Sequence, residues 1–406
     1  MPLPRSLACL AILATSSTAQ TLITVDDNGP ADFADLPAAM AAAQNGDVVV
    51  VAAGSYSGFV VDGKAVTLQG DGAVDVVGTI TYRNVPASSY LAVRGIAVDP
   101  QAGVGFRFED CQGAVLVEEC TALIGNPAME LLNCDDAAIV DCTLSGRSGS
   151  FLPAVPAAAG LRMEDSNVYL HGGTHQGGRG YDAQCLLGSP NVQPEPGSAA
   201  IGIFGSVLFI SSGTGVQGGD GGDGCENDIN EFCIDGGNGG DGLFLDAAST
   251  VVEQGGAAWD GGAGGVPGNG NYGCMEGWPG GSWGGPGAIS FLNVEVRGTK
   301  LSSPAVAGST TTLSMSGETG DTPFLLLGLP AAPYLFKPAL GGVLMAPGFV
   351  AVVPLLPLGA PASFSVPLTL PPLPTDVATL AVQGFFVATD GSKTLSPPSH
   401  LVVTAP

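Results

Sequence analysis

The sequence predicts an all-β protein in which a long parallel β-solenoid is followed by a small C-terminal β-sandwich. A pattern of two short apolar strands recurs through the middle of the 406-residue chain. Around residues 301–310 this Gly- and Asp-rich region gives way to short apolar runs separated by Pro and Gly. Hydrophobic residues make up 45% of the chain, which argues against general disorder.

The first 19 residues predict a secretory signal peptide. Arg5 supplies the positive start, residues 7–14 form a short apolar run, and residues 17–19 form a small-residue cleavage site before Gln20. The apolar run is too short to span a bilayer. Cleavage would remove Cys9 and leave eight of the nine cysteines, an even number that favours disulfides in an oxidising compartment. We therefore expect a monomeric protein that is secreted or held at the cell surface, without a transmembrane segment.

The charge of the chain excludes one class of partner. Asp and Glu number 37 against 12 Lys and Arg, and the formal net charge is −25. A chain this acidic, without any basic run, cannot neutralise a phosphate backbone. Nucleic-acid binding is therefore not expected.

Six copies of the two-strand pattern define the solenoid. Each copy begins with a pair of apolar residues two positions apart: Phe106/Phe108, Met129/Leu131, Leu161/Met163, Ile201/Ile203, Leu243/Leu245 and Ile289/Phe291. Each continues with a second-strand anchor: Val117, Ile139, Leu170, Ile210, Val252 and Val296. The shortest spacing, from residue 106 to residue 129, matches one solenoid turn built from three short strands.

The spacing between successive copies grows along the chain, by similar amounts for the first-strand pairs and for the second-strand anchors. The added residues therefore enter each coil at one place, after the second strand, and should project as a row of loops from one side. Between the inward pairs, Arg107, Glu130 and Arg162 should stack as an outward ladder of alternating charge. We interpret this ladder as surface ion pairs rather than as a substrate-binding ladder.

Residues 23–72 resemble the N-terminal start of pectate-lyase-like right-handed β-helix proteins. The resemblance rests on Asp32-Phe33, the Ala-rich segment after it, Gly46-Asp47 with its Val run, and residues 54–56 and 66–70. It implies a right-handed parallel β-helix over residues 20–303, with the Ala-rich segment as a helix that caps the open end. It implies no particular activity, because this fold carries many chemistries.

Residues 310–406 are predicted to form the β-sandwich, because short β-rich runs recur there about every ten residues. The region is similar to a C-terminal module of secreted planctomycete and myxobacterial-type proteins. The similarity rests on Pro347-Gly348, residues 371–372, residues 382–384 and residues 395–398. We interpret it as a cap of the solenoid and a surface or export tail, with carbohydrate binding as the alternative.

The eight remaining cysteines fall into two groups. Cys111 with Cys134, and Cys120 with Cys142, hold equivalent positions in adjacent coils. These are candidate disulfides, because stacked coils lie about 4.8 Å apart, although stacked free thiols are also compatible with the spacing. Cys185, Cys225, Cys233 and Cys274 lie in the projecting loops, where the offsets favour Cys185–Cys225 and Cys233–Cys274 over a local Cys225–Cys233 bridge.

Two Gly-rich nonapeptides, 218–226 and 236–244, fit the nine-residue pattern of RTX calcium turns. The candidate ligands are carboxylates, which suit Ca²⁺: Asp220, Asp223, Asp235 and Asp241. The intervening nonapeptide does not fit, so we favour flexible loops tied by disulfides, with calcium as the candidate ion and no cofactor required. Three tryptophans of the same region are candidates for stacking on sugar rings or for packing the loops on the solenoid wall: Trp259, Trp278 and Trp283.

The candidate catalytic groups are Asp135, Asp136 and Asp141, with Glu119 stacked near Asp141. Clustered carboxylates are what glycoside hydrolysis needs. The motifs of polysaccharide lyases and hydrolases are otherwise incomplete, so we favour a secreted, non-catalytic surface protein. It would bind glycans or cell-surface partners through its row of Gly-rich loops. The alternatives are a polysaccharide-active enzyme, of the pectin-type lyase or glycoside-hydrolase class, and a calcium-stabilised structural module.

Overall fold

The structure of the protein is a computed structural model. It describes residues 20–101, 103–185, 192–211, 213–227, 232–268, 274–292, 297–328, 335–337, 342–344, 349–360, 362–370 and 376–406. The predicted signal peptide, residues 1–19, and the predicted anchor Val296 lie outside these residues. In the part of the chain that is described, no helix has the length and apolar character needed to cross a membrane.

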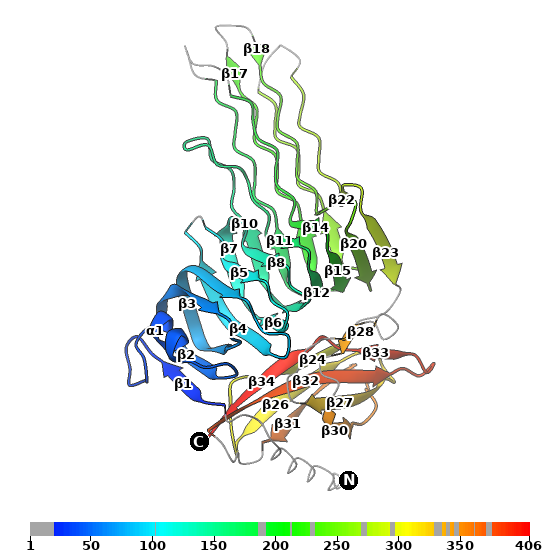
Figure 1. Cartoon of the computed structure of the whole chain (residues 1–406). Helices are drawn as coiled ribbons and strands as arrows, with labels where there is room; N and C mark the ends of the chain where they lie inside the picture. Colours follow the sequence, from blue (N-terminus) through cyan, green and yellow to red (C-terminus); the bar gives the residue numbers. More distant parts are fainter. Residues whose placement is uncertain are drawn as a thin grey trace.

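The chain folds as the predicted right-handed parallel β-helix followed by a β-sandwich (Figure 1). Twenty-one strands form one continuous sheet whose neighbouring coils pair in parallel. The N-terminal strands are β1 (Leu22–Val25), β2 (Val48–Asp62), β3 (Thr67–Arg83) and β4 (Tyr90–Asp99).

Successive coils of three short strands follow. The first coil contains β5 (Phe106–Glu109), β6 (Ala114–Glu118) and β7 (Thr121–Gly125), and the second contains β8 (Met129–Leu132), β9 (Asp136–Val140) and β10 (Thr143–Gly146). The third contains β11 (Leu161–Glu164), β12 (Asn167–His171) and β13 (Thr174–Gln176), and the fourth contains β14 (Ile201–Phe204), β15 (Val207–Ser211) and β16 (Gly215–Gln217). The fifth contains β19 (Leu243–Leu245), β20 (Thr250–Gln254) and β21 (Ala258–Asp260), and the last described strands are β22 (Trp283–Gly284) and β23 (Ala288–Leu292).

The inward side chains stack in register from coil to coil. The first residue of each inward pair lies directly on its neighbour: Phe106, Met129, Leu161, Ile201 and Leu243. All five are fully buried and belong to one hydrophobic cluster that runs through the solenoid. Burial of these alternate positions is what stabilises a coil that cannot form a core by itself.

The prediction was wrong for the last copy of the pattern. Ile289 and Phe291 lie in β23, which pairs with β20, so they belong to a second strand rather than a first. In β20 the residue in register with Ile210 is Glu253, and the predicted anchor Val252 therefore points outward. Two adjacent valines make the alternation ambiguous at this point, and only the pairing of strands resolves it.

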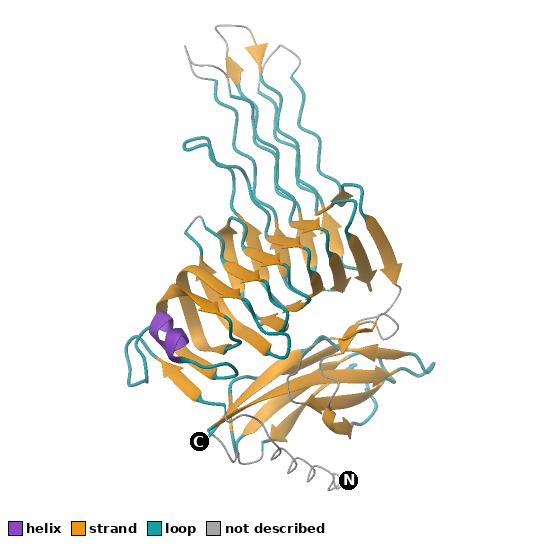
Figure 2. Cartoon of the chain, viewed as in Figure 1, coloured by secondary structure: helices purple, strands orange, loops and turns teal. Residues whose placement is uncertain are grey.

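The Ala-rich segment forms the capping helix α1 (Leu36–Ala42), the one helix among the described residues (Figure 2). The Asp35 side chain accepts a hydrogen bond from the Leu36 amide at the N-terminus of this helix. Leu36, Ala39 and Met40 are buried in the solenoid core. The helix thereby covers apolar residues that the first coil would otherwise expose.

The stacked cysteines of the solenoid are buried free thiols rather than disulfides: Cys111, Cys134, Cys120 and Cys142. Each donates a hydrogen bond to a backbone carbonyl of the preceding coil, as in the pair Cys134 Sγ and Phe108 O at 3.6 Å. Burial raises the pKa of Cys142 well above its ordinary value, which keeps it protonated. Of the two states compatible with the sequence spacing, the structure therefore has the thiols.

Two further sheets enclose a second core and form the sandwich. One contains β24 (Gly298–Leu301), β26 (Thr310–Ser316) and β31 (Ser363–Thr369). The other contains β25 (Ala305–Val306), β34 (Ser399–Thr404), β32 (Val377–Val387), β27 (Thr322–Gly328) and β30 (Phe349–Pro354), with β33 (Lys393–Leu395) beside β32. Two short hairpins complete the described strands: β17 (Glu226–Asn227) with β18 (Phe232–Cys233), and β28 (Leu335–Lys337) with β29 (Gly342–Leu344). Strand β24 precedes residue 303 but pairs with β26 of the sandwich.

A buried ion pair joins the sandwich to the outer surface of the solenoid. The Arg94 side chain is 2% exposed and donates hydrogen bonds to the carbonyls of His400, at 2.8 Å, and Leu301, at 3.0 Å. Next to it, Glu118 accepts hydrogen bonds from Ser399 Oγ at 2.6 Å and from His400 Nδ1 at 3.1 Å. Burial alone would raise the pKa of Glu118, but His400, Arg94 and Ser399 outweigh it and the pKa is lowered. The contribution of Glu118 to stability is therefore present above the ordinary carboxyl pKa and is lost as the pH falls through the lowered value.

Replacing Arg94 by Met should lower the free energy of unfolding by about 3–5 kcal/mol, because the buried Glu118 would lose its neighbouring cation and the carbonyls of His400 and Leu301 would lose their donor. The matched control is Arg83→Met, since Arg83 pairs with Asp62 at the surface and both side chains are about half exposed. That control should cost no more than about 1 kcal/mol. Chemical denaturation of the three proteins measures both values. Equal losses in the two variants would show that the Arg94 pair does not hold the sandwich in place.

Candidate functional site

The Gly-rich insertions project from one side of the solenoid as a bundle that we call the stalk (Figure 1). Its described segments are 177–185, 192–200, 218–226, 232–242, 260–268 and 274–282. The row of loops on one side is present as predicted. The predicted position, after the second strand, was wrong: a third strand (β13, β16 or β21) follows the second before each insertion begins.

The stalk segments are extended rods that hydrogen-bond to their neighbours with a period of three residues. In the rod 218–226, the amides of Gly218, Gly221 and Gly224 donate to the carbonyls of residues 260, 263 and 266 in one neighbouring rod. The amides of Gly219 and Gly222 donate to residues 198 and 195 in a second neighbour. A three-residue repeat without hydrogen bonds inside the rod is typical of the polyproline II conformation. This rod is thus held by hydrogen bonds on two sides, whereas the composition predicted flexible loops.

In the rods 218–226, 232–242 and 260–268, close contact with neighbouring rods places glycine at two of every three positions over most of their length. A Cβ atom added to Gly222 would lie 1.8 Å from the carbonyl oxygen of Tyr181, and one added to Gly221 would lie 2.0 Å from that of Gly237. Backbone at such separations leaves no room for a side chain, as at the axis of collagen. The third residue of each turn faces outward and carries the surface chemistry of the stalk.

Aspartate and asparagine at these third positions satisfy the backbone of the next rod. Their Oδ1 atoms accept from amides at 2.7–2.9 Å in the pairs Asp220–Ala263, Asp223–Val266, Asp235–Met275, Asn238–Trp278 and Asp241–Gly281. The four candidate calcium ligands therefore act as backbone acceptors, and uncharged Asn238 makes the same bond. Within the described ranges, no three His, Cys, Asp or Glu side chains gather in a group that could hold a metal ion.

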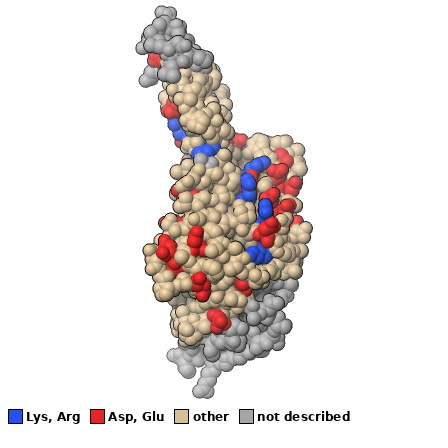
Figure 3. Space-filling model, turned by 60° about the vertical axis from the view of Figure 1, so that its left-hand side comes forward, with Lys and Arg blue, Asp and Glu red and all other residues tan. Residues whose placement is uncertain are grey.

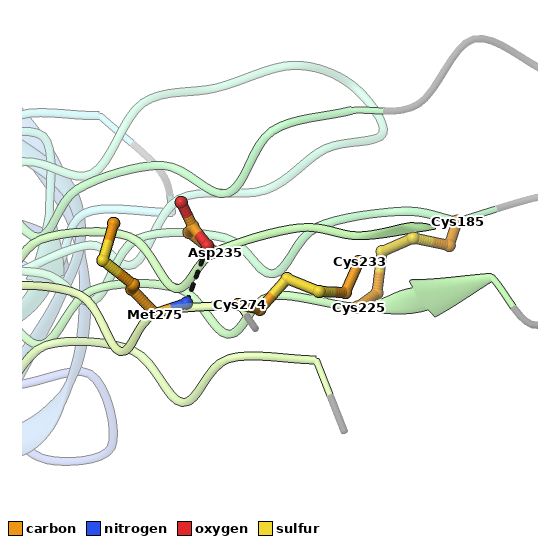
Figure 4. The surroundings of a disulfide bond; sticks show 6 residues. All are labelled: Cys185, Cys225, Cys233, Asp235, Cys274 and Met275. Atoms are coloured by element: carbon orange, nitrogen blue, oxygen red, sulfur yellow. Dashed lines mark hydrogen bonds between the residues drawn. A yellow bond between two sulfur atoms is a disulfide. The ribbon is translucent and has the colours of Figure 1, made fainter. Parts of the chain in front are cut away.

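Two disulfides tie neighbouring rods together at the far end of the stalk (Figure 4). They join Cys185 to Cys225 and Cys233 to Cys274, the pairing that the sequence offsets favour. The Cα atoms are 5.9 Å apart in both bridges, within the usual range. Near Cys274, the hydrogen bond from the Met275 amide to Asp235 continues the contacts between the two rods (Figure 4).

A groove of about 510 Å³ lies where the stalk meets the first-strand face of the solenoid. The predicted ladder of charges leads into it: Glu130 binds Arg107 at 2.7 Å and Arg162 at 3.0 Å, and charged side chains interleave along one side of the molecule (Figure 3). The next residue in register is Gly202, and Phe244 follows. Since Gly202 has no side chain, the Phe204 ring lies over it, 3.1 Å from where a Cβ atom would stand, between Arg162 and Phe244.

Two aromatic rings form the solenoid side of this groove. The rings of Phe204 and Phe244 lie 6.0 Å apart, and the Arg162 guanidinium lies 5.7 Å from the centre of the Phe204 ring. The opposite wall is stalk backbone with a few polar side chains, at residues 196–199 and 238–241. Sequence analysis missed both phenylalanines, although the repeat register puts Phe244 at an outward position that could have indicated it.

The three tryptophans have different surroundings. Trp259 packs against the solenoid core and meets the Trp283 ring edge-on at 6.5 Å. Trp278 is 75% exposed and Trp283 is 51% exposed. The Trp278 backbone amide donates to Oδ1 of Asn238, which lines the groove. Trp278 itself does not line the groove, and it belongs to the rod next to that of Asn238.

The candidate catalytic carboxylates do not form one cluster. Asp136 begins β9 and Asp141 directly follows its end, so roughly 16 Å of extended chain separates them. Asp135 lies beside Asp136 and is exposed. Glycosidase carboxylates act across about 5–9.5 Å. Asp135 and Asp136 are therefore too far from Asp141 to act with it, and Asp141 lies instead in a cleft beside the sandwich.

Comparisons with known proteins give limited information. No protein-family model matches the chain, and no curated protein matches it. Among solved structures, it is similar to the full-length tailspike protein 2 of Escherichia coli O157:H7 bacteriophage CAB120, with 11% identity and a TM-score of 0.30. That similarity covers 88% of this chain, which spans 62% of the tailspike chain. A similarity this low supports no conclusion about function.

Replacing Gly222 by Ala should destabilise the stalk by about 1–3 kcal/mol, because the new methyl group would collide with the Tyr181 carbonyl. The matched control is Gly359→Ala, since a Cβ atom at Gly359 meets nothing within 4 Å. Limited proteolysis should cut the stalk of Gly222→Ala faster than that of the control. Identical cleavage rates would contradict the close packing of the rods.

Replacing Asp220 by Ala should destabilise the stalk by about 1 kcal/mol, because the Ala263 amide would lose its acceptor. Asp220→Asn should remain close to the wild type, since Asn238 makes the same bond elsewhere in the stalk. The rate of proteolysis, measured with and without a chelator, tests both variants. A loss in Asp220→Asn equal to that in Asp220→Ala, together with a chelator effect on the wild type, would instead support calcium binding.

Proposed function

We propose that this is a secreted, non-catalytic β-helix protein that binds glycans at the cell surface or outside the cell through the face of its stalk. The observation that carries the proposal is the groove at the stalk base. There exposed aromatic rings meet polar backbone and the side chains of Arg162, Asn238 and Asp241.

The chemistry of this face fits sugar rings better than it fits an apolar ligand. Phe244 and Trp278 offer flat apolar surfaces on which a sugar ring can stack. Asn238 and Asp241 use one oxygen each for the backbone of the next rod, and both residues line the groove. A few polar groups around an apolar floor are typical of binding pockets of this size.

The wider assignment belongs to the same proposal. Residues 1–19 would be the signal peptide, residues 20–303 the β-helix of pectate-lyase-like type, and residues 310–406 a sandwich module of the kind found on secreted proteins. The two disulfides are compatible with an oxidising compartment outside the cell. A monomer and the absence of a required cofactor are expected and remain predictions.

The two alternative functions can be tested separately. A polysaccharide-active enzyme would release soluble oligosaccharides, and a calcium-stabilised module would melt at lower temperature in a chelator. The separation of Asp136 from Asp141 counts against an active site that uses both. The use of the stalk carboxylates as backbone acceptors counts against the predicted calcium set.

Removing either ring should weaken glycan binding roughly three- to tenfold, because each stacked ring contributes about 0.5–1.5 kcal/mol. The variants are Phe244→Ala and Trp278→Ala, and the control is Leu356→Ala, which removes a 76% exposed side chain on the sandwich. Affinity electrophoresis in gels that contain acidic or neutral polysaccharides measures retention, and mass spectrometry of the incubated polysaccharide detects any cleavage.

The possible results distinguish glycan binding at the groove from its alternatives. Retention that falls in both ring variants but not in Leu356→Ala would support the proposal. If no polysaccharide of the panel retains the wild-type protein, or if the ring variants behave as the control does, the proposal is wrong. Released oligosaccharide would replace it with the enzyme alternative.

A further inference from the structure

A second cavity lies between the solenoid and the sandwich, away from the stalk. It has a volume of about 410 Å³. The ends of β6, β9 and β12 contribute one wall, and the sandwich strands β24, β26 and β31 contribute the other. A cavity of this size accommodates a molecule of one or two sugar rings. We refer to it as the interface cleft.

The sandwich wall of the interface cleft is rich in hydroxyl groups. Five serines line it, among them Ser399, and the other four form two directly opposed pairs on neighbouring strands: Ser314 with Ser365, and Ser316 with Ser363. The Oγ atoms of Ser314 and Ser365 lie 2.8 Å apart and hydrogen-bond to each other, which leaves one hydroxyl hydrogen and free lone pairs for a bound ligand. Phe364 alternates with these serines along β31, and its side chain packs against the sandwich core on the other face of the sheet.

The solenoid wall carries a carboxylate that has no hydrogen-bond partner among the described residues, that of Asp141. Asp141 has a left-handed backbone with φ near 52°, and its carboxylate lies over Gly172, where a Cβ atom would come within 2.1 Å of Oδ1. The Asp141 side chain is exposed to solvent, but its partial desolvation raises its pKa, and the nearby Glu118 and Glu119 raise the pKa further, while Lys300 and Arg94 oppose them.

Three carboxylates lie around the cleft, and two of them have direct partners. Glu119 is bound by Lys300 at 2.5 Å and by Arg94 at 3.1 Å, and Arg94 also lies beside Glu118. His400 and Ser399 bind Glu118 as well, so Asp141 is the one of the three without a direct partner. The other titratable group in the wall, His171, supplies no charge near neutral pH, because burial lowers its pKa to about 4.

We propose that the interface cleft binds a compact cation that also carries hydroxyl groups, chemically an amino sugar. Its ammonium group is held by Asp141 and its hydroxyls by the serine pairs of β26 and β31. This site is independent of the stalk groove, since the two cavities share no lining residue.

The test is calorimetric titration of the full chain with glucosamine, glucose and glucuronate at neutral pH. Glucosamine should bind at least tenfold more tightly than glucose, and glucuronate should bind most weakly. Asp141→Asn should reduce glucosamine affinity about tenfold and leave glucose affinity unchanged. Asn tolerates the left-handed backbone of Asp141, so this variant should keep the fold.

Two further variants make the result specific. Asp135→Asn makes the same change at an exposed position at the other end of β9, and it should not affect any of the three titrations. Lys300→Met removes an opposing cation and should strengthen glucosamine binding several-fold. Absence of glucosamine binding to the wild type, or equal affinity in Asp141→Asn and Asp135→Asn, would overturn the proposal. Retention on polysaccharide gels should be unchanged in Asp141→Asn, which separates this site from the stalk groove.

Discussion

Parallel stacking in register is the constraint on which the rest of this structure depends. Each coil of the solenoid hydrogen-bonds with the coils before and after it, and its inward side chains lie directly on theirs, as Phe106 lies on Met129 and Leu161 on Ile201. A coil can therefore lengthen only where the added chain leaves and returns without shifting the strands. The insertions after β13, β16 and β21 obey this rule. Because their starting points are stacked, the insertions run side by side, and the stalk follows from the solenoid.

Inside the stalk, buried backbone groups also need hydrogen-bond partners, and neighbouring rods supply them without forming β-strands. In the rods 218–226, 232–242 and 260–268, glycines at two positions of most turns let neighbouring rods approach until amides and carbonyls pair. The third position faces outward, and there Asp or Asn satisfies the amide of the next rod. The remaining outward positions are free to carry recognition chemistry, such as the Trp278 ring. The bundle is thus a rigid support whose surface can vary at every third residue.

The outer surface of the solenoid is divided between two uses. The second-strand face is covered by the sandwich and is fixed there by Arg94, Glu118 and His400. The cover is incomplete at one place, where Asp141 and the serine pairs of the sandwich enclose the interface cleft. The first-strand face remains open and carries the charge ladder, which ends at Gly202 and the aromatic groove. Both proposed sites therefore lie where two different parts of the chain meet.

The sequence by itself determined the β-helix, its capping helix, the sandwich, the ladder from Arg107 to Arg162 and the single side from which the insertions project. These features depend on local alternation and on spacing, which a sequence displays directly. Only the tertiary structure decided the register of β20, where adjacent valines hide the buried Glu253, and the state of the stacked cysteines. It also decided the role of Asp220 and its equivalents, because the same residue in a Gly-rich segment suits a calcium ligand or a backbone acceptor. The difference depends on which rod lies beside it. The groove at Phe244 and the cleft at Asp141 arise from contacts between segments far apart in the chain, so no local pattern encodes them.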